Sequence, residues 1–101
     1  MSVGICVKVH RSGKELLVAA CDSEIIGRTY TEGKLRIHLS RDFYGGDAVE
    51  EDVFVNRLEI ATIANLVGKR TIDMAVKHGF VDPECILVID GVPHAQMARM
   101  I

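Results

Sequence analysis

Alternating apolar and polar residues at the start of the chain predict a β-hairpin. Apolar side chains recur at every second position, at Val3, Ile5, Val7 and Val9. This is the period of a strand with one buried face. A turn-forming segment at Arg11-Ser12-Gly13-Lys14 follows, and residues 16–21 are apolar on both faces, as in a strand inside a sheet. We therefore expect the two runs to pair as a hairpin.

The next segment predicts a short helical turn and a third strand. Asp22-Ser23-Glu24 can cap the turn, which Gly27 would end in a left-handed conformation. Beyond a turn at Glu32-Gly33, Leu35, Ile37 and Leu39 alternate with polar residues. This alternation predicts a strand with one face buried.

Two helices are predicted in the second half of the chain. Asp47 is a suitable N-cap, and apolar residues recur at helical spacing from there through Val67, before Gly68. The later part of this long helix is apolar nearly all round, so we expect it to be deeply packed. Thr71 can cap a second, shorter helix that ends at Gly79.

The C-terminal region predicts a second hairpin. Residues 85–89 are another run that is apolar on both faces, and Asp90-Gly91 after it is typical of a tight turn. Because Pro93 has no N–H to donate, we expect it in an extended edge strand. Residues 94–101 fit either a continued edge strand or a short helix.

The order of these elements favours an α+β fold, because strands come first and helices later. A chain of 101 residues has room for one domain. The sequence thus predicts a single α+β domain over residues 1–101. In it a mixed or antiparallel sheet of about four to five strands packs on one long and one short helix.

Composition narrows the class of protein. With 49% hydrophobic and 26% charged residues and two prolines, the chain is typical of a folded globular protein rather than a disordered or fibrous one. The cysteines, Cys6, Cys21 and Cys85, form no CxxC pair, which favours a reducing compartment and leaves their reactivity open. The longest unbroken apolar run covers only residues 16–21, too short to span a membrane. We expect a cytoplasmic protein without membrane contact.

Charge is distributed unevenly along the chain. The formal net charge is −2, but residues 1–41 hold seven Lys or Arg against four acids, and residues 42–59 hold six acids against one Arg. If the first and third strands share a sheet, their polar faces form a stripe that could neutralise phosphates. Its members are Lys8, His10, Lys34, Arg36 and His38. The competing interpretation is an ordinary solvated sheet face, and no aromatic residue alternates with these charges to stack on bases.

Enzyme and cofactor motifs are missing from the sequence. Gly68-Lys69-Arg70-Thr71 has the Gly-Lys of a phosphate-binding loop, but Arg70 stands where that loop needs a hydroxyl. Neither GxGxxG nor GxSxG occurs, and the four histidines and three cysteines lack the local spacing of a metal site. We expect no cofactor, no metal and no catalytic residue. Lys69 and Arg70 remain a basic pair beside helix N–H groups that could hold a phosphate.

Three further segments carry candidate binding residues. Phe43-Tyr44-Gly45-Gly46 sets two aromatics beside glycines that permit a close backbone approach, or Phe43 simply packs on the core edge. His94 and Gln96 are two apart, so on a strand both point the same way. Asn65 lies on the apolar stripe of the predicted long helix, where it needs a partner or caps the helix end.

Four segments in combination resemble a small archaeal family catalogued as domain of unknown function 424. They are Ile5-Cys6-Val7-Lys8-Val9-His10, Phe43-Tyr44-Gly45-Gly46, Ala64-Asn65-Leu66-Val67-Gly68 and Gly91-Val92-Pro93-His94-Ala95-Gln96. The likeness covers nearly the whole chain. It implies a cytosolic archaeal protein, and it brings no established activity, cofactor or catalytic residue.

The leading hypothesis is a non-enzymatic module that binds RNA or a ribonucleoprotein of the translation class. In it Lys8, Lys34, Arg36 and Arg70 would contact phosphate and Tyr44 would stack on a base. An alternative is a small enzyme or metabolite-binding protein with a pocket around His94, Gln96, Asn65 and Tyr44, where His94 would act as acid or base. A third is a protein-interaction subunit that pairs with itself or a partner through an edge strand near Pro93. The candidate binding residues are Lys8, Lys34, Arg36, Tyr44, Gly45, Gly46, Asn65, Lys69, Arg70, His94 and Gln96.

Overall fold

The predicted N-terminal hairpin forms the start of a six-stranded sheet. In the computed structural model, which describes residues 4–99, β1 (Ile5–Ser12) and β2 (Glu15–Asp22) pair antiparallel along their whole length. Gly13 adopts the positive φ of 59° that the connecting turn requires. Val3, which the sequence places in the first strand, lies outside the described residues.

The prediction of a long helix over residues 48–67 is wrong. The segment divides into β5 (Asp47–Val49), α2 (Glu51–Ile60) and β6 (Ile63–Val67), and the N-cap is Glu50 rather than Asp47. The helix ends at Ile60, because the next residue, Ala61, has an extended ψ of 142°. At Thr62 the chain joins β2, because the Thr62 N–H donates to the Leu16 carbonyl and the Leu16 N–H donates to Thr62 Oγ1. A buried strand and a buried helix are both apolar all round, so periodicity did not separate them.

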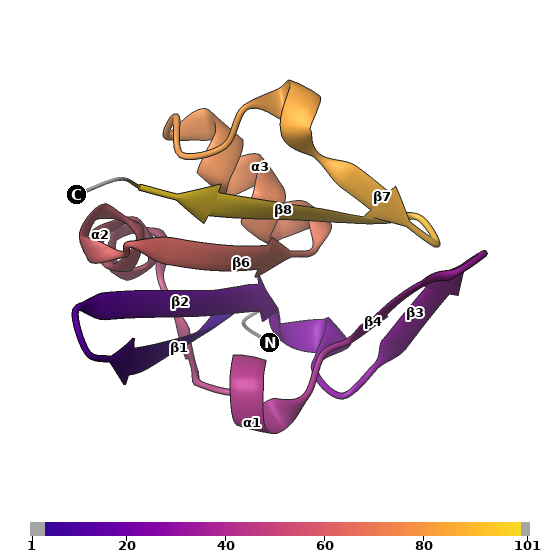
Figure 1. The fold of residues 1–101 in the computed structure, drawn as a ribbon, viewed down its shortest axis with the longest axis horizontal. Helices are drawn as coiled ribbons and strands as arrows, with labels where there is room; N and C mark the ends of the chain where they lie inside the picture. The colour runs from indigo at the N-terminus through magenta and orange to yellow at the C-terminus, as the bar shows by residue number, and fades with distance from the viewer. Residues whose placement is uncertain (1–3, 100–101) are drawn as a thin grey trace.

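The main sheet is larger than the sequence predicted and contains one parallel pair. Its spatial order is β5, β1, β2, β6, β8 (Val92–Ala98), β7 (Leu87–Ile89), and β2 and β6 run parallel while the other neighbours run antiparallel (Figure 1). The alternative of a C-terminal helix is thereby settled for residues 94–98 in favour of a strand. Residues 100–101 lie outside the described part of the chain.

Pro93 does not lie on an edge strand, contrary to expectation. β8 is inside the sheet, between β6 and β7, and the edges are β5 and β7. Proline is tolerated there because Gly68, opposite it, donates its N–H to the Pro93 carbonyl at 2.9 Å, while the Gly68 carbonyl accepts the Ile72 N–H of the next helix and needs no donor from Pro93.

Two layers cover the two faces of the main sheet. On one face α2 and α3 (Lys69–Lys77) pack Phe54, Leu58, Ile72 and Ala75 against the sheet, all of them 2% exposed or less. On the other face a smaller cluster joins Cys6, Ala19, Cys21 and Val67 to α1 (Arg41–Tyr44) and to the Leu39 side chain. Two short 3-10 turns, at Ser23–Ile25 and Pro83–Cys85, complete the fold.

The predicted third strand belongs to a separate sheet. β4 (Leu35–His38) pairs antiparallel with β3 (Thr29–Glu32), a strand that the sequence analysis did not identify, and the two form a two-stranded sheet of their own (Figure 1). The premise of a basic stripe shared by the first and third strands is therefore wrong.

Within residues 4–99 no helix has the length and hydropathy required to cross a membrane.

Candidate nucleic-acid interface

The β3–β4 hairpin has one face toward the protein and one toward solvent. Directly paired residues share a face of a sheet. The pair Tyr30 and Ile37 is half-buried and packs on the smaller core cluster, so this face points inward. The pairs on the opposite face therefore point outward, and their members are Thr29, Thr31, Arg36 and His38, all exposed.

Three exposed cations are spread along the hairpin. Arg36 lies on its outward face, Lys34 in the turn at its tip and Arg28 just before β3 at its base, and none of these three takes part in an ion pair within residues 4–99. The acid of the hairpin, Glu32, lies on the inward side, where its carboxylate accepts the Asp90 N–H at 2.8 Å. The three cations are thus exposed to solvent, and Arg36 has no carboxylate on its own face of the hairpin.

The imidazole on this face is held in place. The Thr29 hydroxyl lies 2.7 Å from His38 Nδ1, across the first pair of the hairpin. Thr31, directly opposite Arg36, presents a second hydroxyl. Sequence reasoning missed Arg28 and Thr31, although the run Thr-Tyr-Thr before the Glu32-Gly33 turn has the β-branched and aromatic composition of a strand.

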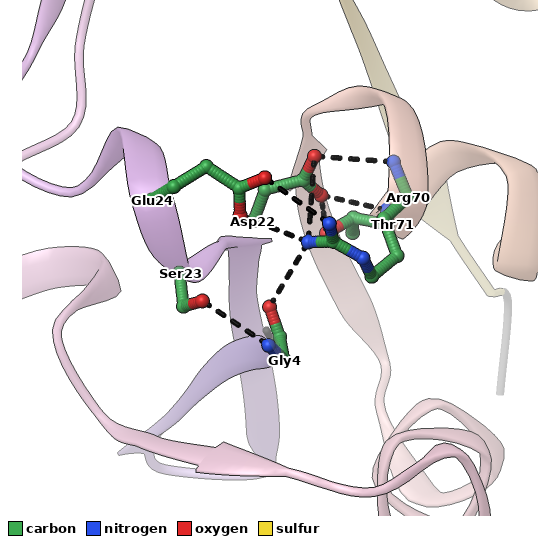
Figure 2. A network of polar contacts seen from close by, with 6 residues as sticks. All are labelled: Gly4, Asp22, Ser23, Glu24, Arg70 and Thr71. Carbon is green, nitrogen blue, oxygen red and sulfur yellow. Dashed lines mark hydrogen bonds and ion pairs between the residues drawn. The ribbon is translucent and has the colours of Figure 1, made fainter. Parts of the chain in front are cut away.

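Arg70 lies in a different environment, in which its guanidinium is bound by acidic side chains of the protein (Figure 2). Its guanidinium donates to both Glu24 carboxylate oxygens, at 2.9 and 3.1 Å, and to the Gly4 carbonyl at 3.4 Å. The hydrogen bond from Arg70 lowers the pKa of Glu24 below its usual value. Asp22 also lies 4.0 Å from the guanidinium. Arg70 is therefore a link between β2, the turn after it and α3.

The N-terminus of α3 is likewise occupied by a carboxylate of the protein. Asp22 accepts the backbone N–H of Arg70 at 3.1 Å and of Thr71 at 2.8 Å, and the Thr71 hydroxyl at 2.8 Å (Figure 2). The expected capping by Thr71 is wrong, because the N-cap is Gly68 and Thr71 is the third residue of the helix. The expected side-chain cap of the Ser23–Ile25 turn by Asp22 is also absent, since that carboxylate is turned toward α3.

Lys69 is exposed at the rim of a surface pocket of about 420 Å³ beside this network. The pocket is lined by both acids and bases, among them Asp73 and Lys77. Its field is mixed, so Lys69 does not extend a cationic surface there.

Tyr44 does not present its ring to solvent. Ser40 accepts the Phe43 N–H and begins the short helix α1, in which Tyr44 is only 5% exposed. Burial raises the pKa of its phenol to about 12. The Phe43 ring stacks on His10 with centroids 4.9 Å apart, and His10 Nε2 lies 2.9 Å from the Phe43 carbonyl. The interpretation of Phe43 as packing on the core edge is the one that the structure bears out.

Gly45 and Gly46 accommodate the protein's own backbone. A Cβ at Gly45 would collide with the Arg41 carbonyl, and a Cβ at Gly46 with the Val7 carbonyl of β1. Lys8 follows Val7 on β1 and is half-buried in the main sheet, not on the hairpin. Gly45 and Gly46 therefore let the end of α1 lie close against β1.

The structure brings together three of the residues named for a small-molecule pocket. Asn65 on β6 lies directly opposite Gln96 on β8, and the Gln96 amide donates to Asn65 Oδ1 at 2.9 Å. His94 points to the same side of β8, and burial lowers its pKa. His94 and Gln96 line a surface pocket of about 250 Å³ together with Cys85, Leu87 and Ala95, whereas Tyr44 is buried in the smaller core cluster.

The histidines, cysteines and acids of the described residues are dispersed. Across the described residues, no three His, Cys, Asp or Glu side chains are grouped as a metal ion would require. The thiols of Cys6 and Cys21 are buried and that of Cys85 is exposed, all of them free.

Comparison with known proteins places the fold. A crystal structure of an uncharacterized conserved protein from Methanopyrus kandleri is similar to this chain, with a TM-score of 0.79 and 23% sequence identity over 96% of this chain and 95% of that one. No curated protein sequence matches. The family described as protein of unknown function (DUF424) matches residues 10–100. The match extends over nearly all of the sequence, so the chain belongs to the DUF424 family.

Proposed function

We propose that this protein is a non-enzymatic module that binds RNA, alone or in a ribonucleoprotein, through the exposed side chains of the β3–β4 hairpin. The observation that carries the proposal is the set of cations Arg28, Lys34 and Arg36, which are exposed and in no ion pair within residues 4–99. Such cations release counterions from the phosphates, which supplies nearly all of the non-specific affinity for nucleic acid and a large share of the specific affinity.

The hairpin also offers neutral groups between its charges. Thr31 lies opposite Arg36, and the His38 ring is fixed by Thr29. Hydroxyls of this kind contact phosphates and the 2′-hydroxyl by which proteins distinguish RNA from DNA. We do not include Arg70 or Tyr44 in this surface, because Arg70 is bound to Glu24 and Tyr44 is buried.

Location in the cytosol forms part of the same proposal. It is supported by the exposed free thiol of Cys85, which suits a reducing compartment.

The test is titration of a labelled structured RNA at several salt concentrations. We expect binding whose logarithm falls linearly with the logarithm of salt. The variant Lys34→Ala/Arg36→Ala should reduce that slope by roughly 1.4 to 1.8, about 0.7 to 0.9 for each lost phosphate contact. A DNA of the same sequence should bind more weakly if Thr31 contacts the 2′-hydroxyl.

A matched control is available in the β1–β2 turn. The variant Arg11→Ala/Lys14→Ala removes the same charge from exposed residues at the far end of the molecule from the hairpin tip (Figure 1). It should leave the slope nearly unchanged. Equal losses in the two variants would mean that only net charge matters, and no binding at about 50 mM salt would exclude the RNA function.

A second candidate function has its own support in the His94–Gln96 pocket. Burial keeps the imidazole neutral near pH 7, as a general base requires, and the amide beside it could orient a small ligand. A screen of metabolites by thermal shift, with His94→Gln as the comparison, tests it. A hit that stabilises both proteins equally would not bind at this pocket.

A further inference from the structure

The edge of the main sheet at β7 is a short strand that carries neither a charged residue nor a proline. β7 is the outermost strand at its end of the sheet (Figure 1). Its residues Leu87 and Val88 are 46% and 50% exposed, although both are large and hydrophobic. Charged residues and proline normally discourage pairing at an edge, and Leu87–Ile89 contains neither.

The register of the C-terminal hairpin determines which backbone groups point outward. Asp90 and Gly91 have φ values of 52° and 78°, as in a two-residue turn, so Ile89 and Val92 form the hydrogen-bonded pair beside it. The N–H and C=O of alternate residues point to opposite sides of a strand. Those of Leu87 and Ile89 therefore face β8, and those of Val88 face the open edge.

A second residue presents its backbone in the same way. Ile86, two residues before Val88, has the extended φ and ψ of −84° and 126°. Within residues 4–99 its backbone makes no hydrogen bond to another turn or loop. At the other end of β7 the Asp90 N–H is already bound to the Glu32 carboxylate. The edge thus offers the backbone of Ile86 and Val88, and the hairpin limits it at Asp90.

We propose that this edge pairs with the same edge of a second copy of the chain. An antiparallel pairing about a two-fold axis at Leu87 sets Ile86 opposite the partner's Val88, and Val88 opposite the partner's Ile86. Each open N–H and C=O of one chain then meets an open C=O or N–H of the other. A second copy supplies this spacing by construction, because a two-fold interface is self-complementary.

The side chains agree with this occupant. Leu87 lies opposite the partner's Leu87 in a non-hydrogen-bonded pair, where side chains approach most closely. The half-exposed Leu87 and Val88 would lose water in this contact. Because the strand is short, the buried area is small and the dimer forms at high concentration. The β3–β4 cations are not used, so the dimer does not rest on the RNA proposal.

Disulfide cross-linking tests the register. In a Cys85→Ser background, Leu87→Cys places two thiols opposite each other across the axis, within the Cα separation of about 4.4 to 6.8 Å that a disulfide accepts. Treatment with diamide, which takes up the two electrons, should give a cross-linked dimer at least tenfold faster than for Cys85→Ser/Ile60→Cys. Ile60 is the matched control, being 51% exposed on α2. Equal rates for the two variants would overturn the proposal.

Sedimentation equilibrium tests the interaction itself. The wild-type chain should pass from monomer toward dimer as its concentration rises to roughly 500 µM, in the range of a weak complex. Val88→Pro removes the outward N–H without removing a bond to β8, so it should fold normally and remain monomeric. Lys34→Ala/Arg36→Ala should dimerise like the wild type. A wild-type chain that stays monomeric, or a Val88→Pro variant that still dimerises, would refute the pairing.

Discussion

Replacing Gly68 by alanine should damage the join between β2 and α3 more than a glycine substitution ordinarily does. Gly68 has φ of 110° and ψ of 151°, a conformation that residues with a side chain rarely adopt. A Cβ at this position would also lie 2.5 Å from the carboxylate carbon of Asp22. The Asp22 carboxylate would have to move away from the N–H groups of Arg70 and Thr71.

The expected cost combines two effects. Backbone strain in a sparsely populated region costs about 1–3 kcal/mol. Loss of an N-terminal cap costs about 1–2 kcal/mol. Their sum is roughly 2–5 kcal/mol, a large part of the 5–15 kcal/mol that stabilises a typical domain. At about 4 °C per kcal/mol for a chain of this size, the melting temperature should fall by roughly 8–20 °C.

The assay is urea unfolding followed by circular dichroism, with two controls. Gly79→Ala meets a positive φ of 78° but no atom within 4 Å, so it reports strain alone at about 1–2 kcal/mol. In an Asp22→Ala background the collision is gone, and Gly68→Ala should then cost only the backbone strain of about 1–3 kcal/mol. If Gly68→Ala costs the same with and without Asp22, the carboxylate does not hold α3 and the reasoning fails.

Three other expectations follow from burial. Leu58→Asp should lower the free energy of unfolding by at least about 3 kcal/mol, because Leu58 is fully buried. Ile60→Asp on the same helix should lower it little, because Ile60 is half-exposed. Equal melting temperatures for the two variants would contradict this. Burial lowers the pKa of His94, so protonation favours the unfolded chain and the free energy of unfolding should decline as pH falls below about 6.5. In urea titrations His94→Gln should remove that part of the pH dependence. An unchanged pH profile in the variant would contradict this. Of the three thiols, Cys85 alone should react quickly with a disulfide reagent in the native protein, because the other two are buried and their pKa values raised; fast release of more than one equivalent would show otherwise.

Local signals predicted those parts of the fold that local interactions decide. The β1–β2 hairpin and the Asp90-Gly91 turn formed as expected, because each is set by alternation and by residues that accept positive φ. The end of α3 also formed as expected. Gly79 and Phe80 donate to the carbonyls of Val76 and Ala75, the bonds that close a helix with a left-handed glycine.

The sequence misled where long-range contacts decide. Residues 60–67 are apolar enough for a buried helix or a buried strand, and the choice depends on pairing between Thr62 and Leu16, far apart in the chain. Splitting that segment created β6, and β6 in turn moved β8 from the edge into the sheet. One ambiguous segment thus accounts for three wrong predictions: the length of the helix, the number of strands and the edge position of Pro93.

The same dependence on distant contacts governs the candidate site. From sequence, Arg36 and Arg70 are equivalent, since each has another cation within two residues. The fold distinguishes them, because it brings Glu24 to Arg70 and turns Glu32 away from Arg36. The charge of a cation that is bound to a carboxylate is already neutralised, so it adds little to the field that attracts phosphates. Which arginine is available is therefore a property of the tertiary structure, and a charge count along the chain does not contain it. The same reasoning predicts that Glu24→Gln, which releases Arg70, should strengthen RNA binding and steepen its salt dependence.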